Sequence, residues 1–475
     1  MALLPARLDL DALRSVRRAL VVGMGRSGQE AARLLLQLGV ETVKATDLNP
    51  DAARVPGTVP VYGSHERSDF LEADLIVVSP GVPGDMTHLE IATGHGVPVV
   101  GELGLAAAVL HDPSVPGGPP PLLAVTGTNG KSSTCWLLGQ LLEQAGFHPF
   151  VGGNLGAPLS LLAQARLAGD LQHDAGVVEV SSYQLERPGP LRPVAAAVLN
   201  LTPDHLARHG DMHTYAAAKL ALFQRMGADA LAVLPAADPW LPAAAVQRRP
   251  TPPRLQLLGG RPGAWAAGEQ LIFEGTGDDG RLALAGFPLP GVHNRSNLAV
   301  AMLLAAELGV DRAALDLSAL RPLPHRLEPV PSTDGRRWIN DSKATNVDAA
   351  VVGIQGSPAG ATILVGGAGK AGADYRALGE ALAQQAARVL CFGRSGQEIH
   401  DAIHQYITDI PSETLTSLDA AVGAAAAQTP PGGAIVLCPA CASFDEFRNF
   451  EHRGEHFAQL ARAAEAPTNG GLESP

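Results

Sequence analysis

Short apolar runs alternate with segments of helical periodicity along most of the chain. In the first part, a helix-type segment runs through Leu38 and separates the first two of four strand-like apolar runs, at 19–22, 41–46, 75–78 and 97–100. Strands that alternate with helices predict βαβ units and therefore a parallel sheet. The proline- and glycine-rich stretch 112–121 cannot continue either element, and we expect a linker there.

The same alternation continues in two further segments. The second has helical patterns at 214–224 and 296–308, a hairpin formed by 270–273 and 281–285, and strand patterns at 122–125, 175–180 and 194–199. The pattern resets near the prolines of 321–324, and strands follow at 361–365, 388–392 and 434–437. We therefore predict an α/β chain of three domains, with bounds at 1–112, 113–322 and 323–475.

Composition narrows the class of protein. A chain of 475 residues is too long for one ordinary core, and 46% apolar content indicates well-buried domains. The 47 Asp and Glu outnumber the 35 Lys and Arg, and the net charge of −12 disfavours a nucleic-acid or anionic-membrane partner. Charged residues interrupt the leucines of 1–16, and no apolar stretch approaches the ~20 residues that span a bilayer. We expect a cytoplasmic protein.

The four cysteines are too few for a disulfide scaffold. Cys438 and Cys441 have the spacing of a zinc knuckle, but no second pair completes a zinc site. Cys135 and Cys391 have no such spacing. Packed thiols in a reducing compartment are the favoured interpretation.

A glycine-rich turn follows the first strand. Gly23, Gly25 and Gly28 have the spacing of a dinucleotide-binding turn, and Asp47 ends the next strand. Such a turn places backbone amides and a helix N-terminus near a pyrophosphate, and the carboxylate binds a ribose hydroxyl. A UDP-sugar and a nicotinamide dinucleotide both present these groups, so the turn alone does not choose between them.

A second glycine-rich loop has the sequence Thr-Gly-Thr-Asn-Gly-Lys-Ser-Ser at 126–133. It lies between a strand and an apolar helix, the context of a loop that cradles phosphates, with Lys131 for the terminal phosphate and a hydroxyl for Mg²⁺. Only two residues separate Gly127 from Gly130, whereas the usual motif has four. The short spacing indicates a particular subset of ATP-binding proteins.

Polar residues also end later strands. Glu179 ends one buried strand, where a Mg²⁺ ligand is expected, although many strands end in Glu. His205 follows the next strand and is as often structural as functional. Lys219 lies in an apolar helix, where a surface lysine is the simpler interpretation unless burial lowers its pKa. In the third segment, mixed polar runs at 324–326 and 340–346 suit loops that bind ligands.

Together these motifs resemble the Mur ligase family, and among its members those that add D-glutamate. The resemblance covers nearly the whole chain and rests on the runs 126–133, 179–186, 202–205 with Lys219, 293–297, 340–346 and 439–454. It implies a UDP-binding Rossmann-like domain, a central P-loop ATPase-type parallel sheet with a small antiparallel addition, and a C-terminal Rossmann-like domain for the amino acid.

The resemblance also implies the chemistry. ATP would convert the carboxylate of UDP-N-acetylmuramoyl-L-alanine into an acyl phosphate, and D-glutamate would attack it. Ser132 and Glu179 would hold one Mg²⁺, and His205 and Lys219 a second, with Lys219 as a carbamate. Lys131, His205 and Lys219 would be the catalytic residues.

Further site residues are carried over from the family position by position. The expected ATP contacts are Gly127, Thr128, Asn129, Gly130, Lys131, Ser132, Ser133, Asn297, Arg326 and Asp341. The expected contacts of the UDP-linked substrate are Gly25, Arg26, Ser27, Gly28, Asp47, Ser79 and Asn154. D-glutamate would be bound by Lys343, Thr345, Lys370, Ser443 and Phe450.

Three other functions are alternatives to a ligase that adds D-glutamate. A different Mur-type or folylpolyglutamate-type ligase would share the chemistry but not the amino acid; the Asp-Asn-Pro-Arg run of relatives that add diaminopimelate or lysine is absent from the sequence. An NAD-dependent oxidoreductase would use the first glycine turn, yet no catalytic His/Arg pair is evident. A non-catalytic binding protein would leave the polar strand ends unexplained. Nothing in the sequence requires an oligomer, so a monomer is expected.

Overall fold

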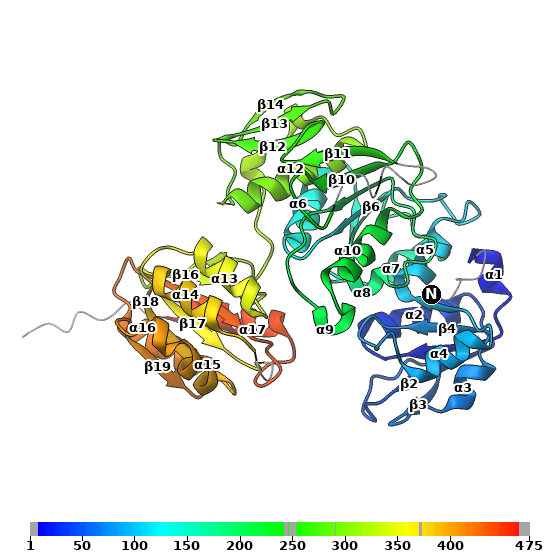
Figure 1. The fold of residues 1–475 in the computed structure, drawn as a ribbon, viewed down its shortest axis with the longest axis horizontal. Helices are drawn as coiled ribbons and strands as arrows, with labels where there is room; N and C mark the ends of the chain where they lie inside the picture. Colours follow the sequence, from blue (N-terminus) through cyan, green and yellow to red (C-terminus); the bar gives the residue numbers. More distant parts are fainter. Residues whose placement is uncertain (1–7, 242–245, 247–252, 290, 370–372, 465–475) are drawn as a thin grey trace, which may run out of the picture. The chain divides into compact units, whose positions relative to one another are not determined.

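The computed structural model describes residues 8–241, 246, 253–289, 291–369 and 373–464 (Figure 1). The chain divides into two compact units, Met1–Arg321 and Pro322–Pro475. Within the described residues the first unit contains two sheets and the second contains one, each combined with helices. The predicted α/β class is confirmed.

The first sheet is parallel throughout, with the strand order β3-β2-β1-β4-β5. Its strands are β1 (Arg18–Val22), β2 (Thr42–Asp47), β3 (Val59–Tyr62), β4 (Leu75–Val78) and β5 (Val99–Gly101). One face packs on α1 (Leu10–Arg14), α2 (Arg26–Gln37) and α5 (Glu102–Leu110), and the other on α3 (Arg67–Glu72) and α4 (Thr87–Gly94). The strand β3 was not predicted from the sequence, because it lies at an edge of the sheet, contains Pro60 and is only partly buried.

The central sheet has the order β14-β13-β12-β11-β10-β9-β6-β8-β7. Neighbouring strands in the series β7-β8-β6-β9-β10-β11-β12 pair in parallel. Strands β12, β13 and β14 form an antiparallel addition that includes the predicted hairpin. The strands are β6 (Leu122–Thr126), β7 (Pro149–Gly153), β8 (Ala175–Glu179), β9 (Ala195–Val198), β10 (Leu231–Pro235), β11 (Arg254–Leu258), β12 (Gly263–Ala267), β13 (Gln270–Glu274) and β14 (Gly280–Ala283).

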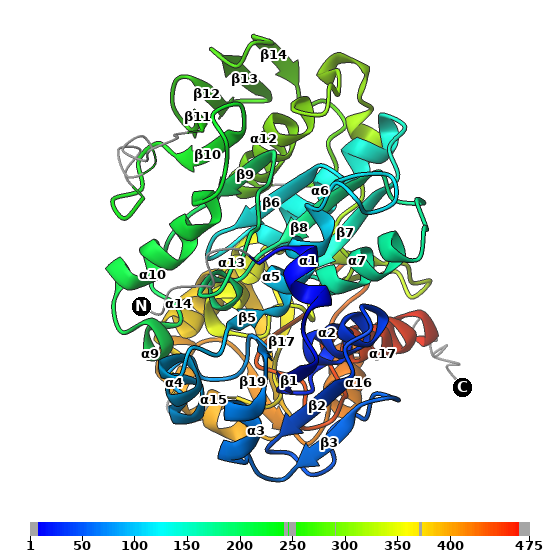
Figure 2. The ribbon, with the colours of Figure 1, turned by 90° about the vertical axis from the view of Figure 1, so that its right-hand side faces the viewer.

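Helices cover both faces of the central sheet. The main ones are α6 (Lys131–Gln144), α7 (Leu159–Leu167), α8 (Ser182–Leu185), α9 (Leu206–His209), α10 (Met212–Leu220) and α12 (Val292–Ala306). α6 and α12 pack together in one core (Figure 2), whereas the opposite face shares a second core with α5 and the first sheet. The two sheets of the first unit are therefore joined by continuous apolar packing.

Two predicted segments differ in detail. The helix expected at 214–224 is the α-helix α10 followed by a 3₁₀ turn, η1 (Ala221–Phe223). The predicted linker 112–121 contains neither helix nor strand, yet Val115 is buried and the Pro116 carbonyl accepts a hydrogen bond from Arg166 at 3.5 Å. The linker is thus packed against the unit.

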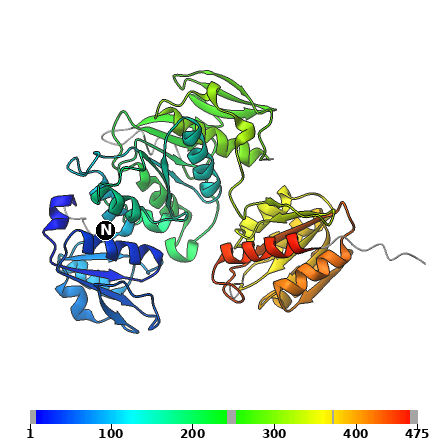
Figure 3. The same ribbon diagram turned by 180° about the vertical axis from the view of Figure 1, so that it is seen from behind.

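The second unit contains a sheet of order β15-β16-β20-β17-β18-β19, parallel except for β15. Its strands are β15 (Glu328–Val330), β16 (Arg337–Asn340), β17 (Ala361–Gly366), β18 (Ala386–Phe392), β19 (Ser412–Leu415) and β20 (Ala434–Ala440). One face packs on α13 (Val347–Gly356), α14 (Arg376–Gln385) and α15 (Gly396–Ile403), and the other on α16 (Leu418–Gln428) and α17 (Phe450–Ala463) (Figure 3).

All four cysteines are free thiols in buried positions. Cys135 lies in α6, and the other three lie in or directly after strands of the third sheet. Cys438 Sγ donates to the Ala350 carbonyl at 3.4 Å and to Asp341 Oδ2 at 3.6 Å. Within the described part of the chain, no helix is long and apolar enough to cross a bilayer.

Candidate active site

The loop after β6 has the form of a phosphate cradle. Lys131 begins α6, and its Nζ donates to the carbonyls of Gly127 and Thr128 at 3.0 and 2.7 Å. Gly130 has φ +86°, a left-handed conformation that favours glycine, and a Cβ there would lie 2.6 Å from Asn297 Oδ1, so the Asn297 side chain would have to shift. Ser132 and Ser133 lie in the first turn of α6, where backbone amides and the helix dipole favour an anion.

A second loop stabilises the cradle from the end of β9. Asn200 Oδ1 accepts from the Asn129 amide at 2.9 Å, and Asn200 Nδ2 donates to the Asn129 carbonyl at 3.0 Å. The Thr202 amide donates to Thr128 Oγ1 at 3.1 Å. These bonds fix Thr128 and Asn129, two of the predicted ATP contacts, before any ligand binds.

Glu179 ends β8, next to β6 in the sheet, and is 2% exposed. Its Oε1 accepts from Asn154 Nδ2 at 2.8 Å. Its Oε2 is buried and has no hydrogen-bond partner among the described residues. A buried carboxylate oxygen without a partner is costly, so this oxygen suits a cation. Asn154, predicted as a substrate contact, here orients the carboxylate.

Lys219 is buried in α10, with 1% of its surface exposed. Its Nζ donates to the Gly127 carbonyl at 2.8 Å and lies 4.7 Å from the centre of the Tyr215 ring. Burial, together with the nearby ammonium of Lys131, lowers the pKa of Lys219 to about 6. The amine is therefore mostly neutral at pH 7, and the surface-lysine alternative is wrong.

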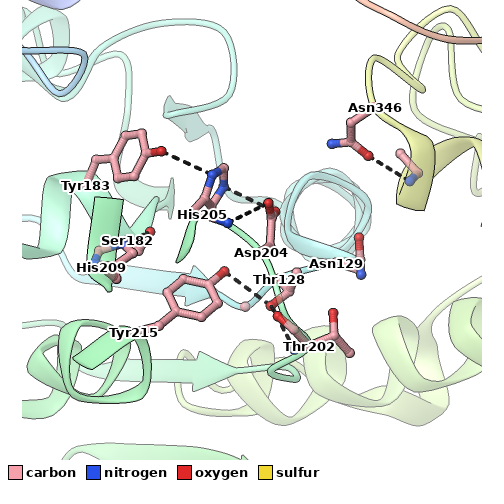
Figure 4. A network of polar contacts seen from close by, with 12 residues as sticks. Thr128, Asn129, Ser182, Tyr183, Thr202, Asp204, His205, His209, Tyr215 and Asn346 are labelled. Carbon is pink, nitrogen blue, oxygen red and sulfur yellow. Dashed lines mark hydrogen bonds and ion pairs between the residues drawn. The ribbon is translucent and has the colours of Figure 1, made fainter. Parts of the chain in front are cut away.

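His205 occupies a left-handed backbone conformation, φ +55°, at the N-terminus of α9. Its Nδ1 lies 3.1 Å from Tyr183 Oη, and its Nε2 lies 3.2 Å from Asp204 Oδ2 (Figure 4). Both ring nitrogens thus have partners, and a metal ion would have to displace one of them. A non-glycine residue in this conformation costs on the order of 1 kcal/mol, which is typical of functional loops.

Aromatic side chains pack next to the residues described above. Tyr215 Oη lies 3.2 Å from Thr128 Oγ1, and the Tyr215 ring stacks on His209 with 5.1 Å between centroids. His209 Nε2 lies 3.0 Å from Ser182 Oγ (Figure 4). Ser181 begins α8 with a capping box that involves Gln184. The run 179–186 is therefore a strand end, a cap and a short helix that together support the site.

Among the described residues, no group of three or more His, Cys, Asp or Glu side chains is placed to hold a metal ion. The candidate ligands in the central sheet are instead mixed in type: a serine hydroxyl, one carboxylate, one imidazole and one lysine. Mg²⁺ usually keeps several waters and is bound by one or two carboxylates together with substrate phosphates. The serine hydroxyl and the carboxylate fit such a shared site, whereas the lysine would provide oxygen ligands only after modification of its amine.

The turn after β1 is compact and contains a carboxylate. Asp47 Oδ2 accepts from the Met24 amide at 2.6 Å, and its Oδ1 accepts from the Asn49 amide at 2.9 Å. A Cβ added at Gly28 would lie 1.9 Å from the Gly23 carbonyl oxygen, so only glycine fits. Ser79 Oγ donates to the same carbonyl at 2.6 Å. Gly25 caps α2, and Arg26 and Ser27 lie in its first turn.

In the second unit, predicted site residues gather at the carboxyl ends of β16 and β20. Asp341 is 1% exposed, and burial raises its pKa to about 6, opposed by the Arg326 charge. Lys343 Nζ lies 4.6 Å from the centre of the Phe450 ring. Thr345 follows in the same loop, and Ser443 is buried just after β20. Lys370 lies outside the described residues.

Arg453 holds these loops together, and the sequence analysis gave it no role. It is fully buried in α17, and burial lowers the pKa of its guanidinium to about 10. Its nitrogens donate to Ser342 Oγ and to the carbonyls of Ser342, Cys441 and Ala442, at 2.9 to 3.2 Å. Arg453 lies in the run 439–454 on which the family resemblance partly rests, and that position could have identified it.

Other contributors were also missed. Tyr215 lies four residues before Lys219, one helical turn away, and that spacing could have identified it. Asn200 and Asp204 lie in the polar run that contains His205. Asn297, which was predicted, comes from the distant helix α12 and contacts the loop at Gly130. In the first unit the structure brings Lys131, Lys219 and Asn297 to one loop, with Glu179 at the end of the neighbouring strand.

Comparisons with known proteins identify the family. The Mur ligase middle domain matches residues 125–305, the Mur ligase MurD-like N-terminal domain matches 17–101, and the Mur ligase glutamate ligase domain matches 325–441. The chain belongs to the Mur ligase family. The first glycine turn thus lies in a Mur ligase N-terminal domain, which disfavours the oxidoreductase alternative.

Relatives of nearly full length share one name. UDP-N-acetylmuramoylalanine–D-glutamate ligases from Anaeromyxobacter dehalogenans, Solibacter usitatus and Geotalea uraniireducens are 40%, 38% and 36% identical to this chain. Each match covers 94% of this chain and 97 to 98% of the relative.

Solved structures share the fold at low sequence identity. MurC from Thermotoga maritima matches with a TM-score of 0.57 and 17% identity, over 94% of this chain and 98% of that one. MurF from Acinetobacter baumannii matches with a TM-score of 0.58 and 16% identity, over 84% and 93%. These matches support the three-domain Mur ligase architecture.

Proposed function

We propose that this protein is an ATP-dependent ligase that joins D-glutamate to UDP-N-acetylmuramoyl-L-alanine during synthesis of peptidoglycan precursors. The observation that carries the proposal is the similarity of 36 to 40% identity, over 94% of the chain, to relatives named for this reaction. The amino acid is further supported by the match to a glutamate ligase domain at 325–441.

In the proposed reaction the loop of 126–133 binds the phosphates of ATP. The amides at the N-terminus of α6 face the anion, and Lys131 exchanges its two loop carbonyls for a phosphate. The substrate carboxylate attacks the γ-phosphorus of ATP, the bond from that phosphorus to the β–γ bridging oxygen breaks, and ADP leaves as the acyl phosphate forms. The amine of D-glutamate then attacks the acyl carbon, and a tetrahedral intermediate expels phosphate.

Ser132 and Glu179 would hold one Mg²⁺, and His205 and Lys219 a second. The buried Oε2 of Glu179, which has no partner among the described residues, supports the first assignment. Divalent ions would neutralise the charge that accumulates when a carboxylate approaches a phosphate. Asn154 keeps Glu179 Oε1 occupied, so Oε2 is the oxygen left for a cation.

Lys219 is proposed to act as a carbamate. A neutral amine is the form that captures CO₂, and the lowered pKa of about 6 keeps the amine neutral at physiological pH. The carbamate would carry a negative charge next to Lys131 and provide oxygen ligands for the second ion.

The other binding assignments follow the family. Gly127, Thr128, Asn129, Gly130, Ser133, Asn297, Arg326 and Asp341 would contact ATP. Lys343, Thr345, Lys370, Ser443 and Phe450 would bind D-glutamate, whose two carboxylates need cations and neutral donors. Gly25, Arg26, Ser27, Gly28, Asp47, Ser79 and Asn154 would contact the UDP-linked substrate.

The organisation of the chain follows the same assignment. We propose domains at 1–112 for the UDP-linked substrate, 113–322 for ATP and 323–475 for the amino acid. The enzyme would be a cytoplasmic monomer.

Phosphate release with UDP-N-acetylmuramoyl-L-alanine and a panel of amino acids tests the proposal. We expect release that depends on D-glutamate. Equal rates with L-glutamate or diaminopimelate would contradict the substrate assignment, and release without any amino acid would contradict the ligase assignment.

A further inference from the structure

Arg208 lies at the junction of the first two sheets and has an unusually complete set of contacts. Its Nε and Nη2 donate to the two carboxylate oxygens of Glu186 at 2.9 and 2.6 Å. Its Nη1 donates to the Val82 carbonyl at 2.9 Å. The side chain is 18% exposed. A bidentate pair of this kind fixes the plane of the guanidinium. A lysine has a single ammonium group and could not form the same pair.

Val82 belongs to the loop between β4 and α4, which packs on the first glycine turn. Ser79, in the same loop, donates from Oγ to the Gly23 carbonyl at 2.6 Å. A Cβ added at Gly23 would lie 2.9 Å from Val82 Cγ2, so turn and loop are in close contact. The loop that carries the Val82 carbonyl is therefore packed on the glycine turn, so a ligand bound at the turn can act on this loop.

On its other side, Arg208 contacts the catalytic cluster. Its guanidinium carbon lies 5.0 Å from the centre of the Tyr183 ring, whose hydroxyl lies 3.1 Å from His205 Nδ1. Arg208 is also three residues from His205, and its amide donates to the His205 carbonyl at 2.9 Å. The same residue thus contacts the backbone of His205 and the ring of its tyrosine partner.

We propose that Arg208 is a positioning residue that couples binding of the UDP-linked substrate at the first sheet to the placement of His205 at the central sheet. The inference rests on the proposed function. In this proposal Arg208, Glu186 and Tyr183 act on His205 through its position, and none of the three is proposed to contact the reacting atoms. Because coupling is reciprocal, Mg²⁺-nucleotide bound at the central site must in turn raise the affinity for the UDP-linked substrate.

Calorimetry on the full chain tests the coupling without relying on turnover. The dissociation constant of UDP-N-acetylmuramoyl-L-alanine is measured with and without MgADP. In the unaltered protein we expect MgADP to tighten binding by about tenfold, within the usual range for coupled sites. In Arg208→Lys, which keeps the charge but not the fork, we expect that ratio to fall to near one.

Two further variants separate coupling from simple structural support. Tyr183→Phe removes the hydroxyl that contacts His205 but keeps the ring under Arg208, and it should also abolish the ratio. Arg187→Lys is the matched control. Arg187 donates to the Gly84 carbonyl of the same loop at 3.4 Å, but in the described part of the chain it has no hydrogen bond to Tyr183 or His205. This variant should keep the tenfold ratio.

The outcomes are distinct. A folded Arg208→Lys that keeps the tenfold ratio overturns the inference, as does an unaltered protein that shows no ratio. If Arg208→Lys fails to fold, retention of the ratio in Tyr183→Phe overturns it. An unaltered protein that binds the UDP-linked substrate but releases no phosphate with D-glutamate contradicts the proposed function instead, whatever the ratio.

Discussion

The two glycine-rich turns of the first unit both follow a strand and precede a helix. The charged side chains that contact them, however, have opposite signs. After β1, the Asp47 carboxylate accepts from the Met24 amide, so an acidic group occupies the turn. After β6, the Lys131 ammonium donates to the Gly127 and Thr128 carbonyls, so a basic group occupies the loop. Each turn begins a helix whose N-terminus favours an anion.

The difference shows what a glycine spacing does not specify. A carboxylate at the turn suits a hydroxyl-rich group such as ribose, whereas an ammonium suits the terminal phosphates of a nucleotide. The glycines provide close approach in both places, and the neighbouring charge selects the ligand.

Loss of the ammonium should have the largest effect. We expect Lys131→Ala to lower D-glutamate-dependent phosphate release on the order of 10³-fold, because Lys131 is the one cationic side chain of the loop 126–133 and the loop amides do not replace its charge at the transferred phosphate. Steady-state kinetics measure this. The variant should bind the UDP-linked substrate normally by calorimetry, and a variant that retains most of its activity would remove Lys131 from the mechanism.

Lys219, which contacts the same loop from α10, should be nearly as sensitive. Lys219→Ala is expected to lose activity on the order of 10²-fold, because the ligand proposed for the second metal ion is absent. Added acetate or formate should restore part of the phosphate release by supplying the missing carboxylate. Lys219→Ala with full activity, or a loss that no short carboxylate relieves, would argue against the carbamate.

The glycines of the first turn offer a matched pair. Gly28→Ala would place a Cβ 1.9 Å from the Gly23 carbonyl, and we expect a loss of unfolding free energy of about 1–3 kcal/mol by denaturant melts. Gly25→Ala has no atom within 4 Å of the added Cβ and a negative φ of −64°, so its stability should be almost unchanged. Equal losses in both variants would mean that the turn is not limited by space.

The smallest effect is expected at the acidic turn. Asp47→Asn keeps one acceptor for the Met24 amide but removes the charge, and we expect the KM for the UDP-linked substrate to rise about fivefold, the cost of weakening one charge-assisted hydrogen bond. The KM for ATP should not change. A change in both constants would contradict the division of ligands between the two turns.

The sequence predicted most elements whose apolar pattern is continuous. β4, β6 and β17 differ from the predicted runs by one residue at most, because strands buried on both faces have uninterrupted apolar runs. Edge strands such as β3 and β15 were missed, since they are short, contain proline and are partly exposed.

The site followed the same division. The positions of Gly130 and Lys131 at the start of α6 could be predicted because a local motif fixes them, whereas their roles stay predictions. The contacts of Tyr183 with His205, of Asn154 with Glu179 and of Arg453 with the Ser342 carbonyl could not be predicted, because each joins segments that are distant in sequence. Even the lowered pKa of Lys219 depends on burial that its helix alone does not reveal.

The four buried cysteines can report local opening of the cores in which they lie. Cys135 lies in a helix of the central sheet, whereas Cys391, Cys438 and Cys441 lie in the third, and all four are inaccessible in the folded state. A thiol reagent can reach each one only after the surrounding core separates. The rate at which each cysteine is labelled therefore measures how often the core around it opens, separately for the central sheet and the third sheet.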